Sequence, residues 1–223
     1  MISAEIIKKH KDFAICLCFS FLVFLFIISF SIALPIYLRP IYYIYANSAN
    51  LAEKNGLEYR EVKEAYDAVL DYLTLPEKEF STGVLKYSED GKSHFEDCKK
   101  LFSLNTSILI ISAAAITVIL LFSRKKKIIC RLLYRSILYS GTATAIFPLL
   151  IGAVCAVSFD YAFTVFHKLF FPGKSNWIFN PQTDEIIRLL PQEFFALCAV
   201  IIGTSILVLS LCAVYAGLKK KEQ

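Results

Sequence analysis

Two of the chain's three histidines stand in polar stretches beside long apolar runs. His94 lies in "SHFEDCKKLF", residues 93–102, and His167 lies in "FHKLFFPGKSNWIFNP", residues 166–181. A histidine side chain titrates near neutral pH, so a pair of histidines can supply a general base and a general acid for one reaction. We therefore predict a site at which His94 and His167 act together. The plainer alternative is two interfacial histidines with solvated or hydrogen-bonded rings.

The residues around each histidine indicate how its ring is held. Ser93 begins an S-x-x-E capping box, which predicts that a helix starts here with His94 at its first position. The positive end of the helix dipole would keep that imidazole neutral. Asp97 is three residues further on and would share the face of His94. If the third apolar helix continues outward, Asp160 lies two turns before His167 on the same face.

Two other chemistries would use the same residues. Cys98 lies four residues after His94, a spacing that also suits a thiol nucleophile with a histidine base. A zinc site would need both histidines and a carboxylate such as Asp184, and no HExxH or CxxC pattern supports one. We expect no metal and no other cofactor.

Four long charge-free runs must position these residues. Of the 223 residues, 57% are hydrophobic, which exceeds the roughly 45–50% of ordinary soluble domains. Each run matches the roughly 17–25 residues that cross a bilayer. An all-α integral membrane fold is therefore predicted, with transmembrane helices over residues 13–34, 106–122, 136–159 and 194–216. The first run could instead be a cleaved signal peptide, but its apolar core is about twice the usual length for such a peptide.

The basic residues indicate which helix ends face the cytoplasm. Twelve of the 24 Lys and Arg residues lie before the first run, between the second and third, and after the fourth. The positive-inside rule assigns that side to the cytoplasm. Both termini and the loop 123–135 are then cytoplasmic, whereas residues 35–105 and 160–193 face outward. These basic stretches are short and flank the membrane, so we expect no nucleic-acid binding.

The first outer segment is predicted to form a helical extracytoplasmic subdomain. Residues 56–75 carry apolar side chains at intervals of three to five, the stripe of an amphipathic helix, and Pro76 ends it. Residues 80–93 indicate turns with a short hairpin. The helix that starts at Ser93 is then expected to continue into the second transmembrane span without a break.

The second, shorter outer segment combines aromatic and polar residues. Pro172 ends the helix that carries His167, and a short helix is expected over residues 181–190. Trp177 is expected at the level of the lipid headgroups. Candidate substrate contacts are Asn176, Trp177, Phe166, Phe170 and Phe171. Candidate residues for orienting the catalytic groups are Asp97, Asp160, Asp184 and Arg188.

These stretches resemble the motifs of one family. "SHFEDCKKLF" resembles a His-x-x-Asp-x-Lys-x-Leu-Phe motif. Residues 166–195, "FHKLFFPGKSNWIFNPQTDEIIRLLPQEFF", resemble a longer motif of F-H-x-x-F, W, P-x-x-D-x-I-I and P-x-x-F-F. Both motifs are similar to those of the bacterial lipoprotein intramolecular transacylase family, called Lit, and the resemblance covers the whole chain, including the loop lengths. Cys98 and the cysteine-rich helices depart from the family's pattern, which weakens the thiol alternative.

The resemblance implies acyl transfer within a diacylated lipoprotein whose N-terminal cysteine bears a diacylglyceryl group. The acyl chain would leave the sn-2 oxygen of that group and end on the α-amine of the same cysteine, giving the lyso-form lipoprotein. We expect His94 to be the base. His167 would be the acid or the oxyanion donor, with Asp160 or Asp97 holding its ring. The reverse assignment and a transient acyl-histidine both stay open.

The expected partners are the diacylated lipoprotein and membrane lipids, for a monomer in the bacterial cell membrane with its active site on the extracytoplasmic face. One alternative is a non-catalytic assembly or binding protein that uses the outer loop. A transporter is disfavoured, because no apolar run carries a charged residue or a histidine near its middle.

Overall fold

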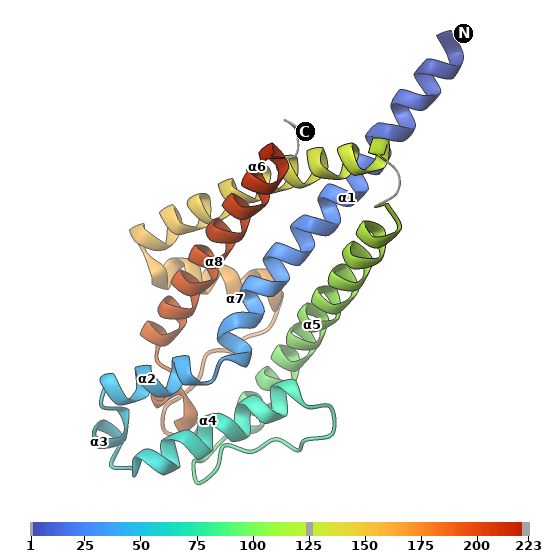
Figure 1. The fold of residues 1–223 in the computed structure, drawn as a ribbon. Coiled ribbons are helices and arrows are strands. Elements are labelled where there is room, and N and C mark those ends of the chain that lie inside the picture. The colour runs from blue at the N-terminus through green and yellow to red at the C-terminus, as the bar shows by residue number, and fades with distance from the viewer. Residues whose placement is uncertain (1, 124–126, 220–223) are drawn as a thin grey trace. The chain divides into compact units, whose positions relative to one another are not determined.

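The computed structural model describes residues 2–123 and 127–219, and every regular element in this part of the chain is helical (Figure 1). Four of these helices are long and apolar enough to cross a membrane, as predicted. They are α1 (Ile2–Tyr37), α5 (Glu89–Ser123), α6 (Lys127–Val157) and α8 (Gln192–Lys219). α1, α5 and α8 extend beyond both ends of their apolar runs, whereas α6 begins before its run and ends at Val157, two residues short of the predicted end. The chain is therefore an all-α membrane protein.

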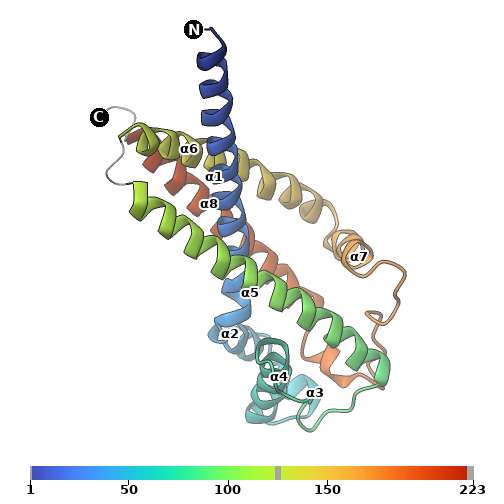
Figure 2. The same ribbon diagram turned by 90° about the vertical axis from the view of Figure 1, so that its right-hand side faces the viewer.

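The remaining helices are shorter, and one of them corrects the sequence prediction. They are α2 (Pro40–Ser48), α3 (Leu51–Asn55), α4 (Tyr59–Thr74) and α7 (Phe159–Phe170), with a 3-10 turn over Glu185–Arg188. We expected the third apolar helix to continue outward to His167, but α6 ends at Val157 and the chain changes direction before α7 (Figure 2). The side chain of Ser158 accepts a hydrogen bond from the Tyr161 N–H at 3.2 Å and so caps the new helix.

The basic residues that we used to assign the membrane sides lie partly outside the described residues. Those outside are Arg124, Lys125, Lys126, Lys220 and Lys221. Residues 127–135, which we expected to belong to a loop, are instead the first turns of α6.

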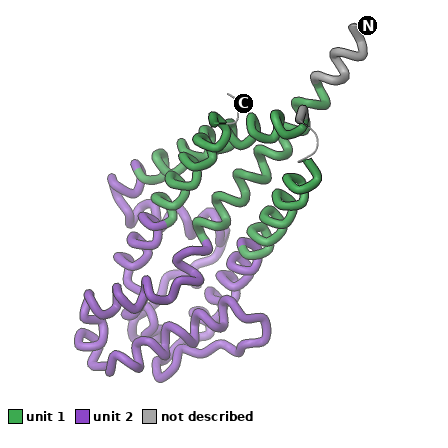
Figure 3. Tube along the Cα trace, in the orientation of Figure 1, with its two compact units in different colours: residues 1–32, 106–152, 202–223 green, residues 33–105, 153–201 purple. Residues whose placement is uncertain are grey.

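The chain divides into two compact units (Figure 3). The first comprises Met1–Ile32, Thr106–Gly152 and Ile202–Gln223, the apolar parts of the long helices. Within it, α6 and α8 approach closely at Gly141, where an added Cβ would lie 2.7 Å from the Ser210 carbonyl oxygen. Small residues at such contacts are typical of helix packing in membranes. The buried apolar side chains of this unit are Phe19, Val23, Ile27, Leu133 and Ile206.

The second unit comprises Ala33–Asn105 and Ala153–Ile201. In it α3 contacts both α2 and α4, and the predicted amphipathic stripe of α4 is buried. Tyr42 of α2 stacks on Tyr66 of α4 with ring centroids 3.7 Å apart, and its hydroxyl donates to the Leu189 carbonyl oxygen at 2.9 Å. The two polar segments of the chain therefore share one core. Residues 80–88 form turns without the strands of the expected hairpin.

Candidate active site

The first turn of α5 is fixed by Asp184, one of the residues that we expected to orient a histidine. The Asp184 carboxylate accepts hydrogen bonds from the N–H and the hydroxyl of Ser88, both at 2.8 Å, and Ser88 Oγ in turn accepts from the Gly91 N–H. Glycine is required at position 91, because a Cβ there would lie 2.1 Å from Asp184 Oδ1. The role of Asp184 is thus to anchor the helix that carries His94.

Because α5 begins at Glu89, the prediction that a capping box starts the helix at Ser93 is wrong. His94 lies in the second turn, away from the unpaired backbone N–H groups that a helix start would have offered. The dipole argument for a neutral His94 therefore fails. The helix does continue from this polar part into the apolar run 106–122 without a break, as predicted.

His94 is kept neutral by its surroundings instead. It lies in the charged part of α5, outside the membrane-spanning run, and only 6% of its surface is exposed. The rings of Phe171 and Phe179 meet it edge-on at centroid distances of 4.9 Å and 5.4 Å. Burial, together with the nearby His167 ring, lowers the pKa of His94 to about 4. Both effects disfavour the imidazolium form.

The two ring nitrogens of His94 have different surroundings. Nε2 lies 3.4 Å from the Sγ atom of Cys98, one helical turn further on. Nδ1 is buried and has no hydrogen-bond partner among the described residues. A buried polar atom without a partner is costly, so this nitrogen is available for a molecule that binds at the site.

His167 is buried on α7, and the backbone holds its ring. Nδ1 lies 2.7 Å from the carbonyl oxygen of Phe163. A carbonyl oxygen only accepts hydrogen bonds, so Nδ1 carries the proton and Nε2 of the neutral ring carries the free lone pair. Burial lowers the pKa of His167, although the hydrogen bond to Phe163 acts in the opposite direction. Because this carbonyl holds Nδ1, the structure does not support Asp160 as the residue that orients the ring.

The site brings the two imidazoles together although they are far apart in the sequence. The ring centroids of His94 and His167 lie 5.7 Å apart with a 34° angle between the planes. The indole of Trp177 stacks on the His167 ring, with centroids 4.7 Å apart and a 27° angle between the planes, so Trp177 forms part of the site. Phe166 and Phe170 pack on each other at 4.6 Å and are each 47% exposed, whereas Phe171 is buried against His94.

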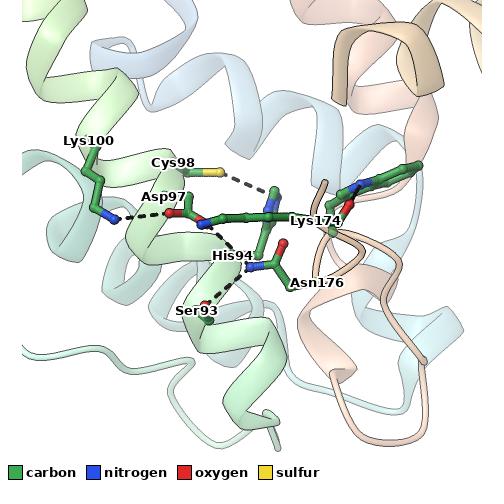
Figure 4. Close-up of polar contacts among 8 residues, drawn as sticks. Ser93, His94, Asp97, Cys98, Lys100, Lys174 and Asn176 are labelled. Atoms are coloured by element: carbon green, nitrogen blue, oxygen red, sulfur yellow. Dashed lines mark hydrogen bonds and ion pairs between the residues drawn. The ribbon is translucent and has the colours of Figure 1, made fainter. Parts of the chain in front are cut away.

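A polar network ties the loop after α7 to α5 (Figure 4). The Lys174 ammonium donates to Asp97 Oδ2 at 2.5 Å, and Lys100 donates to Oδ1 at 3.1 Å. The Nδ2 group of Asn176 contacts Ser93 Oγ at 3.3 Å and Asp97 Oδ2 at 3.4 Å (Figure 4). The hydrogen bond from Lys174 is the main cause that lowers the pKa of Asp97 to about 2. Asp97 therefore holds the loop that places Trp177 on His167, and it is not hydrogen-bonded to either imidazole.

The predicted residues that meet in this site are His94, His167, Asn176, Trp177, Phe171 and Phe166, whose ring meets His167 edge-on at 5.5 Å. Arg188 does not, because its guanidinium donates to the Pro181 carbonyl oxygen at 2.5 Å. Sequence reasoning missed the carbonyl of Phe163, the ring of Phe179 and the ammonium of Lys174. None of the three left a specific signal, since a lysine in a polar turn such as "PGKSN" is ordinarily solvated.

The alternative chemistries fit the geometry less well. Burial raises the pKa of the Cys98 thiol to about 12, and a thiol that stays protonated is a poor nucleophile. Asp184, the carboxylate that we named as an example for a zinc site, is bonded to Ser88 instead. No group of three metal-binding side chains occurs among residues 2–123 and 127–219.

The stacking of the single tryptophan on His167 predicts a pH-dependent fluorescence signal. A protonated imidazole quenches an indole in contact with it, so the emission of Trp177 should fall as the pH is lowered. Because the pKa of His167 is lowered, the midpoint should lie below the ordinary value of about 6.5. The measurement is a fluorescence titration of the solubilised protein. His167→Gln should abolish the transition and His10→Gln should not, while a midpoint at or above the ordinary value would contradict the structure.

Helices long and apolar enough to cross a membrane, together with two buried imidazoles in contact with aromatic rings, define an integral membrane protein with a candidate site for acid–base chemistry. The family model described as "Lipoprotein intramolecular transacylase Lit" matches residues 17–195. The chain therefore belongs to this family and is an acyltransferase, as the resemblance of its motifs implied.

The fold agrees with solved structures of this family. The lipoprotein intramolecular transacylase Lit from Bacillus cereus is 26% identical over 96% of this chain and 100% of that chain, with a TM-score of 0.85. A variant of the Bacillus cereus protein with a histidine replaced by arginine is 25% identical, with a TM-score of 0.81 over 99% of this chain and 97% of that chain. The comparison with curated proteins found no match.

Proposed function

We propose that this acyltransferase moves the sn-2 acyl chain of a diacylglyceryl-cysteine to the α-amine of the same N-terminal cysteine, and that His94 and His167 carry out the proton transfers and charge stabilisation. The observation that supports this most is the approach of the two imidazoles, whose ring centroids are 5.7 Å apart. Both rings are then within reach of a single ester. Because donor and acceptor belong to one molecule, the enzyme must mainly hold the amine and the ester in contact.

The reaction needs three chemical steps. The α-ammonium group, with a pKa near 8, loses one proton to solvent before its nitrogen can attack. The nitrogen then bonds to the acyl carbon, and the carbonyl oxygen becomes an oxyanion that requires a hydrogen-bond donor. Finally the bond from the acyl carbon to the sn-2 oxygen breaks, and the second proton of the amine must reach the departing alkoxide. An ester becomes an amide, so no nucleotide is needed.

His167 is the better candidate for the base. Its Nδ1–H is held by the Phe163 carbonyl, which leaves the Nε2 lone pair free to accept a proton. Because its pKa is lowered, the ring is neutral and available at neutral pH. His167 takes the proton from the attacking nitrogen and returns it to the sn-2 alkoxide, acting first as base and then as acid. This reverses the assignment that we preferred from the sequence.

His94 then stabilises the oxyanion. Its Nδ1 has no partner among the described residues, and the ring is fixed between Phe171 and Phe179. A donor held rigidly in a buried site loses little energy to reorganisation when charge develops beside it. The buried Oδ1 of Asn176, which also has no partner among the described residues, would accept from the amine or the peptide N–H of the substrate.

The aromatic residues would receive the apolar part of the substrate. Phe166 and Phe170 are in contact and partly exposed on α7, where an acyl chain could cover them. We place this site on the extracytoplasmic face, with both termini in the cytoplasm, because of the basic residues that flank the apolar runs. In this proposal the enzyme acts as a monomer. Membrane lipids would surround the long helices, and no nucleic acid is involved.

The test is a lipopeptide analysis. Cells that make ordinary diacylated lipoproteins are given this chain, and the N-terminal lipopeptides are fragmented in a mass spectrometer. We expect unchanged total mass with one acyl group moved from the glyceryl oxygen to nitrogen. A double variant with His94→Ala and His167→Ala is the control. Lipopeptides without N-linked acyl groups, at normal expression of the chain, would refute the proposal and favour a binding role.

A further inference from the structure

One contact in the site has no part in the chemistry above. The Sγ atom of Cys98 lies 3.4 Å from Nε2 of His94, on the same face of α5 (Figure 4). No other hydrogen-bond contact of this imidazole occurs among the described residues, since Nδ1 is buried without a partner. Among the described residues, the thiol is therefore the group in position to influence which ring nitrogen carries the proton.

We propose that Cys98 is a positioning residue, whose thiol donates a hydrogen bond to Nε2 of His94 and so keeps the proton of the neutral imidazole on Nδ1. This inference rests on the proposed function, because it explains how His94 becomes a hydrogen-bond donor. It assigns no covalent chemistry to the sulfur. Cys98 acts on the substrate only through His94.

The first reason is that the sulfur keeps its proton. Cys98 is partly buried within the second unit, next to the Asp97 carboxylate, and both features disfavour a thiolate. A neutral thiol can donate, whereas its sulfur is only a weak acceptor. The lone pair of an imidazole nitrogen is a much better acceptor than sulfur, so the bond runs from S–H to Nε2.

The second reason is that a neutral imidazole carries one N–H group. With Nε2 accepting from Cys98, the proton of His94 must be on Nδ1, the nitrogen that is buried and without a partner among the described residues. A buried N–H that is left unpaired costs free energy in the empty enzyme. A carbonyl oxygen of the substrate would satisfy it, and more strongly once that oxygen becomes negative.

The two histidines then hold opposite tautomers, each fixed by a neighbour four residues away. Phe163 holds the proton of His167 on Nδ1 and leaves Nε2 as the base. Cys98 occupies Nε2 of His94 and leaves Nδ1–H as the donor. Two identical side chains thereby acquire two different functions, base and oxyanion donor.

Nitrogen NMR tests the tautomer directly. The chain has only three histidines, so the ring nitrogens of ¹⁵N-histidine-labelled protein can be assigned with His10→Gln and His167→Gln variants. A protonated and an unprotonated ring nitrogen have well separated shifts. We expect the proton of His94 on Nδ1 in the native chain, a shift toward the other tautomer in Cys98→Ala, and the native tautomer in Cys98→Ser. A native His94 with its proton on Nε2 would overturn the inference.

Kinetics with solubilised enzyme and a diacylated lipopeptide give the second readout. Cys98→Ala should lower kcat about fivefold, the scale of one hydrogen bond, with KM nearly unchanged. Cys98→Ser should restore most of kcat, because its hydroxyl is also a donor. Cys198→Ala, which removes another partly buried thiol that packs on the same apolar core, near Tyr66, is the control for packing loss. Equal kcat in Cys98→Ala and the native chain would overturn the inference, whereas full activity in His94→Ala would instead refute the proposed function.

Discussion

Replacing His167 with Gln is expected to lower kcat/KM by about two to four orders of magnitude, the usual contribution of a general base and acid. Glutamine is close to histidine in size and can hydrogen-bond, but it cannot take a proton from the attacking amine and return it to the alkoxide. The loss should fall mainly on kcat, since Phe166, Phe170 and Trp177 would still hold the acyl chain. The measurement is the rate of O-to-N transfer in a diacylated lipopeptide, followed by mass spectrometry.

The matched control is His10→Gln, which changes the one histidine outside the site. It is exposed on α1 and should leave the rate unchanged. His167→Asn should be as inactive as His167→Gln, because neither amide can act as a base. If either variant kept more than about a tenth of the native rate, His167 would not be the base.

The membrane fold could be predicted from the sequence because its signals are local. Four charge-free runs of bilayer length and the apolar stripe of α4 depend only on nearby residues. Pairing His94 with His167 was possible for a similar reason, as each histidine stands in a polar stretch beside an apolar helix. The distance between the rings could not be predicted, since it depends on the direction of α7.

The errors arose where contacts distant in the sequence override local patterns. The S-x-x-E pattern at Ser93 is a genuine start signal, but Asp184 bonds Ser88 from the other polar segment and the helix begins earlier. Asp97 was expected to hold a histidine, yet Lys174 reaches it from 77 positions away and uses its Oδ2. The third apolar helix was assumed to continue to His167, whereas α6 ends at Val157; Asp160 and His167 nevertheless lie two turns apart, because both belong to α7.

These errors share a cause. Carboxylates near a histidine in sequence look like orienting groups, whereas here the carboxylates hold loops and helix ends. The groups that orient the rings are a backbone carbonyl and a thiol. A carbonyl carries no signal in the sequence, since every residue has one. The spacing of Cys98 from His94 did indicate a contact, but we interpreted it as that of a nucleophile and its base.

The second large effect is expected at His94. Removing an oxyanion donor typically lowers kcat by about two to three orders of magnitude. His94→Ala should therefore retain between about a hundredth and about a thousandth of the native rate. Because His167 remains in place as the base, the pH dependence of the residual activity should keep its native shape. The low-pH transition of Trp177 fluorescence should also persist, which shows that α7 is still folded against its loop.

The two amide substitutions at His94 separate a donor at Nδ1 from one at Nε2. The amide nitrogen of Asn can occupy nearly the place of Nδ1, whereas that of Gln extends toward the place of Nε2, which faces Cys98. His94→Asn should therefore be about tenfold more active than His94→Ala, because the oxyanion contact is partly restored. His94→Gln should recover little. If His94→Gln were more active than His94→Asn, the donor would be Nε2 rather than Nδ1, and the oxyanion would lie on the Cys98 side of the ring.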